Sequence, residues 1–207
     1  MDKAAKFWDR IADHYASKPV RNMPAYEDTL DRCANHLSRH DRVLEIGCGT
    51  GSTALTLSRQ VDHVTACDYS GGMLRIARMR AVQQNRDNTD FLQGTVHDPR
   101  LEPASFDAVL AFNLLHLLPD LEATVSRVHS LLKPGGLFIA KTACMSYMNP
   151  IAKSFLSLVG RTGLIPHVRF LQPHDLDDVM TRELFQITET RTYAETPPRR
   201  FIVAGKI

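Results

Sequence analysis

The chain has 207 residues, of which 43% are apolar and 23% are charged, the composition of a globular protein. This length suits one domain that buries most of its apolar surface. The net charge of +2 is too small to indicate a polyanionic partner, and basic residues are scattered apart from pairs such as Arg199-Arg200. We therefore expect a single domain over residues 1–207 that does not bind nucleic acid.

The amino terminus and the cysteines bear on the cellular compartment. Residues 1–16 are charged throughout and lack the apolar core of a signal peptide. No run approaches the ~18 uncharged apolar residues of a membrane span, so stable membrane insertion is not expected. Cys33, Cys48, Cys67 and Cys144 show no C-x-x-C pair and no zinc spacing, which is typical of reduced, buried thiols. We expect a cytoplasmic protein without a metal site.

The first forty residues predict two helices. Apolar residues from Phe7 to Tyr15 recur at helical spacing, and Pro19 ends this first helix. A second helix is expected from Pro24 to about Arg39. Residues 1–40 would then form N-terminal lid helices.

From residue 42 onward, short apolar runs alternate with helical patterns. The predicted strands are 42–46, 63–67, 90–92, 106–112 and 137–141, and the predicted helices are 52–59, 71–84 and 120–132. A Lys-Pro-Gly-Gly turn is expected at 133–136. Uniformly apolar strands that alternate with helices indicate a parallel sheet covered on both faces.

The last third has a different pattern. One helix is expected at 151–159, and another begins at Pro173 with Gln172 as its cap. Two β-rich runs, 187–193 and 201–206, are joined by a connection too short for a parallel crossover, so residues 185–207 should form an antiparallel hairpin. The predicted fold is α/β and doubly wound, a mostly parallel seven-stranded sheet with this hairpin at one edge.

The stretch V-L-E-I-G-C-G-T-G at 43–51 carries the strongest chemical signal. Its glycines remove Cβ atoms where the backbone turns sharply between a strand and a helix, and the helix then presents free N–H groups to a ligand. Asp68 closes the second strand, at the offset that brings an acid to the ribose hydroxyls of a nucleoside. The G-x-G-x-G spacing differs from the G-x-G-x-x-G of dinucleotide binders, which disfavours a nicotinamide cofactor.

These motifs resemble the class I S-adenosylmethionine (SAM)-dependent methyltransferases. Within that family, the nearest likeness is to the small-molecule branch that includes the ubiquinone and menaquinone C-methyltransferases. The resemblance runs from Phe7 to Lys141, and it implies that residues 42–141 are the cofactor-binding core and that residues 143–183 cap the acceptor site. It rests on the glycine motif at 43–51, the acidic motif C-D-Y-S-G-G-M-L at 67–74, S-F-D-A-V at 105–109, L-L-K-P-G-G at 131–136 and the lid sequence F-W-D-R-I-A-D-H-Y at 7–15.

The resemblance implies roles around the methionine half of SAM. Gly47 and Gly49 let the backbone approach this part of the cofactor, with Glu45 supporting the site. Asn113, at the end of the fourth strand, would close its far side. Tyr15 would cover the sulfonium, where an aromatic face attracts a cation.

Around the nucleoside, the resemblance implies that Asp68 binds the ribose hydroxyls and that Tyr69 and Met73 flank adenine. The backbone N–H of Val96 would meet the adenine ring. Where the family usually has an acidic residue, this chain has Thr95, so Thr95 or the nearby Asp98 would meet the adenine amino group. A second departure lies before the sixth strand, where the family's Gly-Phe is Leu184-Phe185, which places the local turn in question.

Methyl transfer is a displacement that needs an in-line nucleophile about 3 Å from the methyl carbon, and a general base is required only if the acceptor must lose a proton. His116, just past the fourth strand, is the candidate base; a helix-start histidine bonded to backbone is the competing interpretation. Lys18 and Arg21 could meet the SAM carboxylate or be solvated. Cys144 fits a buried hydrophobe, and His174 fits a helix-cap region.

The expected function is transfer of a methyl group from SAM to a small-molecule acceptor. An apolar stripe over 151–159 is compatible with a lipophilic acceptor or with ordinary core packing. Two alternatives stay open, a non-catalytic SAM-binding regulator or partner subunit and a nicotinamide-dependent oxidoreductase. Asn-Leu-Leu-His at 113–116 differs from the Asn-Pro-Pro-Tyr of amide- and adenine-modifying relatives, which disfavours nucleic-acid methylation.

Overall fold

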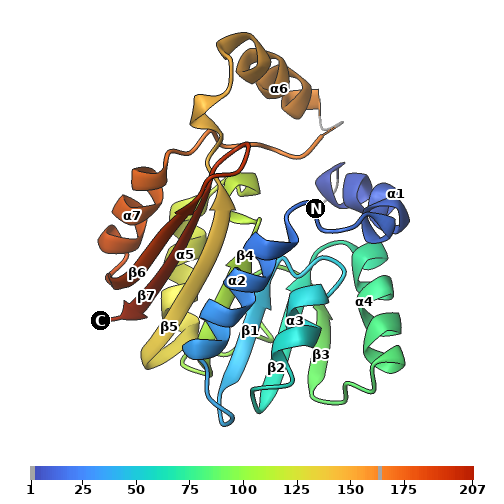
Figure 1. Ribbon diagram of the computed structural model, residues 1–207, viewed down its shortest axis with the longest axis vertical. Coiled ribbons are helices and arrows are strands. Elements are labelled where there is room, and N and C mark those ends of the chain that lie inside the picture. Colours follow the sequence, from blue (N-terminus) through green and yellow to red (C-terminus); the bar gives the residue numbers. More distant parts are fainter. Residues whose placement is uncertain (1–2, 163–164) are drawn as a thin grey trace.

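A seven-stranded sheet forms the centre of the molecule, whose computed structural model describes residues 3–162 and 165–207 (Figure 1). The strand order is β3-β2-β1-β4-β5-β7-β6. β3, β2, β1, β4 and β5 pair in parallel, and β7 runs antiparallel to both β5 and β6. The strands are β1 (Arg42–Ile46), β2 (His63–Asp68), β3 (Thr89–Gln93), β4 (Phe106–Phe112), β5 (Leu132–Ala143), β6 (Phe185–Tyr193) and β7 (Arg199–Lys206).

Helices cover both faces of this sheet (Figure 1). One buried cluster joins the sheet to α5 and α7, and another joins its opposite face to α2, α3 and α4. The helices are α1 (Lys3–Ser17), α2 (Met23–Asn35), α3 (Ser52–Leu57), α4 (Gly71–Gln83), α5 (Leu121–Leu131), α6 (Pro150–Thr162) and α7 (Pro173–Arg182), with short 3-10 turns η1 (Leu115–Leu117) and η2 (Met145–Tyr147). The predicted doubly wound α/β fold with an antiparallel edge hairpin is confirmed.

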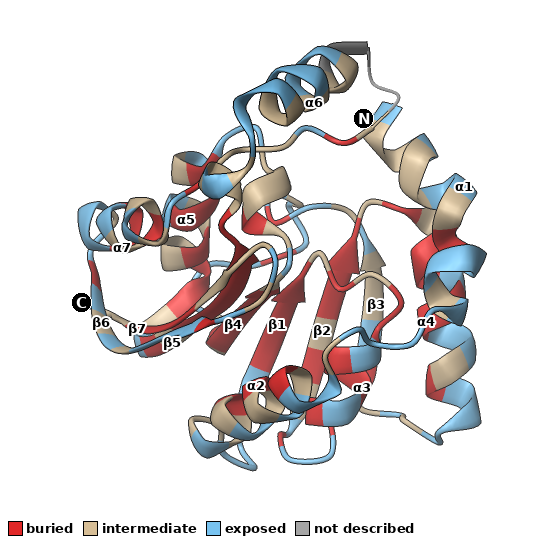
Figure 2. Cartoon of the chain, turned by 45° about the horizontal axis from the view of Figure 1, so that its top comes forward, coloured by how far each residue is buried: buried red, intermediate tan, exposed pale blue. Residues whose placement is uncertain are grey.

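Alternation along the strands creates the two cores. Val109 and Phe138 belong to the cluster under α5, whereas their neighbours Leu110 and Ile139 belong to the cluster under α2 and α3. Successive side chains of a strand point to opposite faces, so a strand buried on both sides must be apolar throughout. Figure 2 shows the central strands buried along their length. Polar ligands therefore meet this sheet at its carboxyl edge, where the loops begin.

Several element boundaries differ from the sequence expectation by a few residues, and two of these differences have a local cause. The second helix ends at Asn35 and not near Arg39, because the side chain of Asp41 accepts hydrogen bonds from both the backbone N–H and the hydroxyl of Ser38 and forms a turn there. The predicted turn at 133–136 lies inside β5 as an irregularity, where the pairing with β4 shifts register between Phe106 and Ala108.

The turn before β6 keeps its shape without glycine. Leu184 adopts φ +61°, the left-handed region that glycine enters without steric cost. Its side chain is exposed, so it does not anchor the turn by packing. The departure from Gly-Phe noted in the sequence is therefore accommodated by local strain.

The expected lid and cap segments lie in different places. α1 stands beyond the carboxyl edge of the sheet against α4, whereas α2 lies on a sheet face with Ala25, Thr29 and Cys33 buried (Figure 1). In the predicted cap, α7 packs on the sheet, while α6 projects from the body on the carboxyl side. Residues 163–164 of that cap lie outside the described residues.

Candidate active site

A cavity of about 540 Å³ opens at the carboxyl ends of β1, β2, β4 and β5, under α1. Most residues expected to bind the cofactor or act on the acceptor line it: Tyr15, Glu45, Gly47, Gly49, Asp68, Tyr69, Met73, Asn113 and His116. Thr95 and Val96 do not line it. Side chains from strand ends far apart in the chain therefore meet in one space, as a doubly wound sheet requires.

The loop after β1 depends on its glycines. Gly47 has φ +65° and Gly49 has φ +54°, both in the region that L side chains rarely adopt. A Cβ at Gly47 would also stand 2.7 Å from Leu114 Cδ1, too close for any real contact. The backbone N–H of Cys48 donates to the carbonyl of Cys67 at 3.0 Å, which holds the loop against β2. The loop thus brings bare backbone to the cavity wall.

Asp68 is built into the same loop. Its carboxylate accepts hydrogen bonds from the backbone N–H of Gly49 at 2.9 Å and of Ser70 at 2.8 Å. Burial raises the pKa of Asp68, and these two N–H donors oppose that rise by favouring the charged form. A carboxylate with further lone pairs facing a cavity is the group that binds vicinal hydroxyls of a ribose.

Glu45 is the most deeply buried acid of the cavity. Burial raises the pKa of Glu45 to about 8, although the backbone N–H of Ala54 donates to its carboxyl group. The second oxygen, Oε2, has no hydrogen-bond partner among the described residues. A buried polar atom without a partner is costly, so this geometry suits a ligand that brings a donor or a positive charge.

α1 is fixed over the cavity by charged contacts. Asp9 Oδ1 accepts from the Ser70 hydroxyl at 2.6 Å and from the Gly72 N–H at 2.8 Å, where α4 begins. A carboxylate there is favourable because the first N–H groups of a helix lack partners. Arg80 of α4 donates to the Ala16 carbonyl and to Thr50 of the glycine loop. These contacts hold Tyr15 at the cavity wall.

The expected adenine side is only partly assembled. Tyr69 and Met73 reach the cavity, at the start of α4. Val96 is buried in the core beside α5, and the Thr95 hydroxyl accepts from the N–H of His97. Asp98 is held by Arg100 at 2.7 Å, which lowers its pKa to about 2. Contacts from Thr95, Val96 or Asp98 to adenine stay predictions.

His116 sits in the short 3-10 turn after β4 and faces the cavity. Its Nδ1 lies 2.9 Å from the hydroxyl of Thr142 on β5. Burial and the nearby guanidinium of Arg199 lower the pKa of His116 to about 4, so the imidazole is neutral at neutral pH. Next to it, Asn113 adopts φ +54° and its N–H donates to the Lys141 carbonyl at 2.7 Å.

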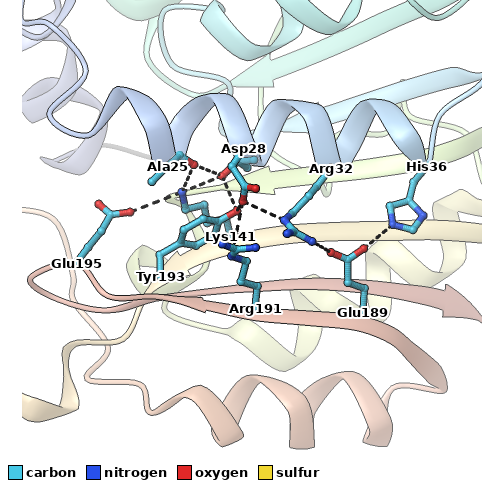
Figure 3. A network of polar contacts seen from close by, with 10 residues as sticks. Ala25, Asp28, Arg32, His36, Lys141, Glu189, Arg191, Tyr193 and Glu195 are labelled. Atoms are coloured by element: carbon cyan, nitrogen blue, oxygen red, sulfur yellow. Dashed lines mark hydrogen bonds and ion pairs between the residues drawn. The ribbon is translucent and has the colours of Figure 1, made fainter.

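Three charged residues of the site were not anticipated from the sequence: Lys141 at the end of β5, Glu195 in the hairpin loop and Arg199 at the start of β7. The Lys141 ammonium donates to the Ala25 carbonyl at 3.1 Å and to Thr29 Oγ1 at 2.9 Å, and it lies 3.7 Å from Glu195 (Figure 3). The sequence signal that could have identified Lys141 is a lysine near the end of a strand whose preceding residues are apolar and mostly buried.

The other candidates divide as follows. Lys18 and Arg21 line the cavity mouth, after α1. Cys144 is fully buried, as expected of a small hydrophobe, and His174 is exposed at the start of α7.

Across 3–162 and 165–207, no group of three or more His, Cys, Asp or Glu side chains is arranged to hold a metal. Within those same ranges, no helix is long and apolar enough to cross a bilayer.

Comparisons with known proteins identify the family. A model described as a methyltransferase domain matches residues 43–136. The ubiquinone biosynthesis O-methyltransferase of Chromobacterium violaceum is 30% identical over 184 residues, which are 84% of this chain and 75% of that protein. The chain belongs to the class I SAM-dependent methyltransferases.

A further relative and a solved structure are also similar to this chain. The protein of the same name from Xylella fastidiosa strain M23 is 33% identical over 148 residues, which are 69% of this chain but only 58% of that protein. A solved SAM-dependent methyltransferase of Thermotoga maritima, described as a possible histamine N-methyltransferase, shares the fold with a TM-score of 0.72 at 21% identity, over 98% of this chain and 99% of that one.

Membership in this methyltransferase family makes the chain an enzyme that uses SAM as its methyl donor for a small-molecule acceptor. The nicotinamide-dependent alternative is excluded, in agreement with the G-x-G-x-G spacing. The residues of the cavity fit this cofactor: a glycine cradle without Cβ atoms, an acid at the second strand end, and an unpartnered buried oxygen of Glu45.

Proposed function

We propose that the acceptor is a hydroxyl compound and that the product is a methyl ether. The observation that carries this proposal is a neutral, half-buried imidazole, His116, which lines the cavity and is held by the hydroxyl of Thr142. SAM supplies an electrophilic methyl group. A hydroxyl that attacks it must lose its proton, so a base within reach is useful for oxygen acceptors in particular. The curated relatives are themselves named O-methyltransferases.

The low pKa of His116 is compatible with this role. A hydroxyl is a weak acid before the reaction, but its proton becomes strongly acidic as the new oxygen–carbon bond forms. A base weaker than ordinary histidine can therefore accept the proton late in the displacement, provided that it is unprotonated beforehand. The hydroxyl of Thr142, 2.9 Å from Nδ1, fixes the ring so that Nε2 is the nitrogen left for the acceptor.

For the cofactor, we propose that Gly47, Gly49 and Glu45 receive the methionine portion. Asp68 would bind the ribose hydroxyls, with Tyr69 and Met73 beside adenine. Tyr15 would cover the sulfonium, and Asn113 would close the far wall. Their common lining of one cavity supports these roles.

A lipophilic portion of the acceptor is a further part of the proposal. α6 exposes Ile151, Phe155 and Leu158, with 79%, 65% and 64% of their surfaces accessible. These residues are spaced four and three apart and so share one helix face. α6 projects on the side of the sheet where the cavity opens (Figure 1).

The four cysteines, all thiols, support a reducing compartment such as the cytoplasm.

The test is methyl transfer from labelled SAM to catechol, aniline and thiophenol, three acceptors of one ring size that differ in the attacking atom. We expect a methyl ether of catechol as the main product, with turnover that depends on His116. Preferred methylation of nitrogen or sulfur, unaffected by His116→Ala, would contradict the proposal.

A further inference from the structure

The acceptor end of the cavity carries an unusual set of charges. Lys141 and Arg199 lie there against a single carboxylate, Glu195, and Lys18 and Arg21 line the cavity mouth. The acids Glu45 and Asp68 lie at the glycine loop, on the cofactor side. No ion pair is found for Lys18 or Arg21 among residues 3–162 and 165–207. A cavity wall with excess positive charge is complementary to an anion.

Lys141 and Arg199 are placed side by side by the sheet register. β5 and β7 pair antiparallel with Ala143 opposite Arg199 and Lys141 opposite Phe201. Because alternate residues of a strand share a face, Lys141, Ala143 and Arg199 point to the same side of the sheet. The small side chain of Ala143 leaves room beneath the guanidinium, and all three residues line the cavity.

Glu195 does not use up these cations. Its Oε2 lies 3.5 Å from Arg199 Nε and its Oε1 lies 3.7 Å from Lys141 Nζ, both beyond hydrogen-bond distance for a well-formed pair. Arg199 Nε and Glu195 Oε1 are buried and have no hydrogen-bond partner among the described residues. Lys141 donates its hydrogen bonds to Ala25 and Thr29, whereas Arg199 keeps donors for a ligand.

We propose that Arg199, supported by Lys141 and Glu195, is an acceptor-binding subsite for a carboxylate, so that the methyl acceptor is a hydroxylated carboxylic acid. A planar guanidinium pairs with a planar carboxylate through two parallel hydrogen bonds, which fixes orientation as well as position. The subsite adjoins His116, so an acid held there presents its hydroxyl toward the candidate base. This assignment deepens the proposed function and rests on it for the identity of the reacting atom.

The test uses benzoate and its uncharged isostere benzamide, titrated by calorimetry into the protein saturated with S-adenosylhomocysteine, so that the carboxylate of the cofactor already occupies its own site. The wild type should bind benzoate at one site and at least ten-fold more tightly than benzamide. Arg199→Gln should weaken benzoate about 10- to 100-fold and remove the preference, the loss expected for a charged hydrogen-bonded pair.

Arg191→Gln is the matched control, because Arg191 lies on the neighbouring strand β6, pairs with Asp28 and does not line the cavity. It should leave benzoate affinity unchanged. Equal binding of benzoate and benzamide to the wild type, which needs no variant, overturns the subsite. Equal losses in Arg191→Gln and Arg199→Gln overturn it as well, since a general charge effect would then suffice.

The outcomes separate the subsite from the reaction. Methyl-ether formation that depends on His116, without selectivity for benzoate, leaves the proposed function standing and removes the subsite. Selective benzoate binding together with turnover unaffected by His116→Ala leaves the subsite standing and removes the oxygen-transfer mechanism.

Discussion

The two halves of the cavity are built in different ways. In the cofactor half, Gly49 and Asp68 are 19 residues apart and are joined directly through a backbone N–H. In the acceptor half, Lys141 contacts Ala25 and Thr29 across 116 and 112 residues, and the nearby carboxylate of Glu195 comes from the hairpin loop. Local backbone geometry forms the first half, whereas the second depends on the tertiary packing of several elements. A binding motif can therefore specify a cofactor without specifying an acceptor.

The halves also differ in charge. Buried acids, Glu45 and Asp68, lie at the glycine loop, and cations collect at the acceptor end. The cofactor half thus attracts a sulfonium and an ammonium, and the acceptor half attracts an anion. The following variants test this division, from the largest expected effect to the smallest.

His116→Ala should lower kcat by about 10²- to 10⁴-fold while leaving S-adenosylhomocysteine binding nearly intact, because the residue belongs to the acceptor half. Since the pKa of His116 lies at about 4, the acid limb of the wild-type kcat profile should fall near that pH and not near 6.5. Single-turnover rates from pH 4 to 9 measure both. A wild-type rate within several-fold of the variant across this range contradicts a catalytic role.

Asp68→Ala should weaken S-adenosylhomocysteine by roughly 2–4 kcal/mol, because it removes a charged acceptor and also leaves the N–H groups of Gly49 and Ser70 unpaired. Asp90→Ala, on the adjacent strand and largely exposed, is the control and should bind normally. Calorimetry gives both dissociation constants. If the benzoate affinity of Asp68→Ala fell as much as its cofactor affinity, the two halves would not be independent.

Glu45→Gln should stabilise the ligand-free protein at alkaline pH. The folded pKa of about 8 lies above the ordinary value of 4.5, so the folded state holds a proton that the unfolded state releases, and stability is lost as the pH rises between these values. At about 1.4 kcal/mol per pH unit, the variant should gain a few kcal/mol by pH 9 and little at pH 5. Urea denaturation at both values measures the gain.

Glu27→Gln, at an exposed position of α2, is the control for that comparison and should show no such pH dependence. Glu45→Gln should also bind S-adenosylhomocysteine more weakly, because an amide, unlike the carboxyl group, cannot ionise when the positively charged amino group of the ligand binds. If the variant had unchanged stability at both pH values, the carboxylate of Glu45 in the wild type would be solvated and not buried in the core.

Leu184→Gly should raise the free energy of unfolding by up to about 1 kcal/mol. Glycine relieves the left-handed conformation, which costs other residues roughly 1–2 kcal/mol, but it adds entropy to the unfolded chain. Leu184 does not line the cavity, so cofactor and benzoate affinities should not change. A lower melting temperature would show that the exposed leucine contributes packing that outweighs its strain.

The fold and the residues that line the cofactor half of the cavity could be predicted because both leave local patterns in the sequence. Strands 42–46 and 106–112 were predicted with their observed bounds because uniform apolarity marks a strand buried on both faces. Gly47 and Asp68 could be recognised because they end two consecutive, adjacent strands, so that a single strand–helix–strand unit brings them together. Glu195 and Arg199 could not, since only the pairing of β7 with β5 brings them to Lys141. The end of α2 was missed because a Ser38–Asp41 side-chain turn overrides helical periodicity.

The attachment of α1 has a thermodynamic consequence. Ala12 is the buried residue of this helix. The position of α1 therefore depends largely on Asp9 and on the contacts with α4, and the helix should open at low free-energy cost. A cofactor that needs Tyr15 in place binds only the docked population, so its apparent affinity includes the docking equilibrium of α1. Linkage then works in reverse, since cofactor at a hundred times its dissociation constant holds the helix down by about 2.7 kcal/mol. The amides of α1 therefore report cofactor occupancy through slowed hydrogen exchange along the whole helix, and not only at Tyr15, the residue that would touch the cofactor.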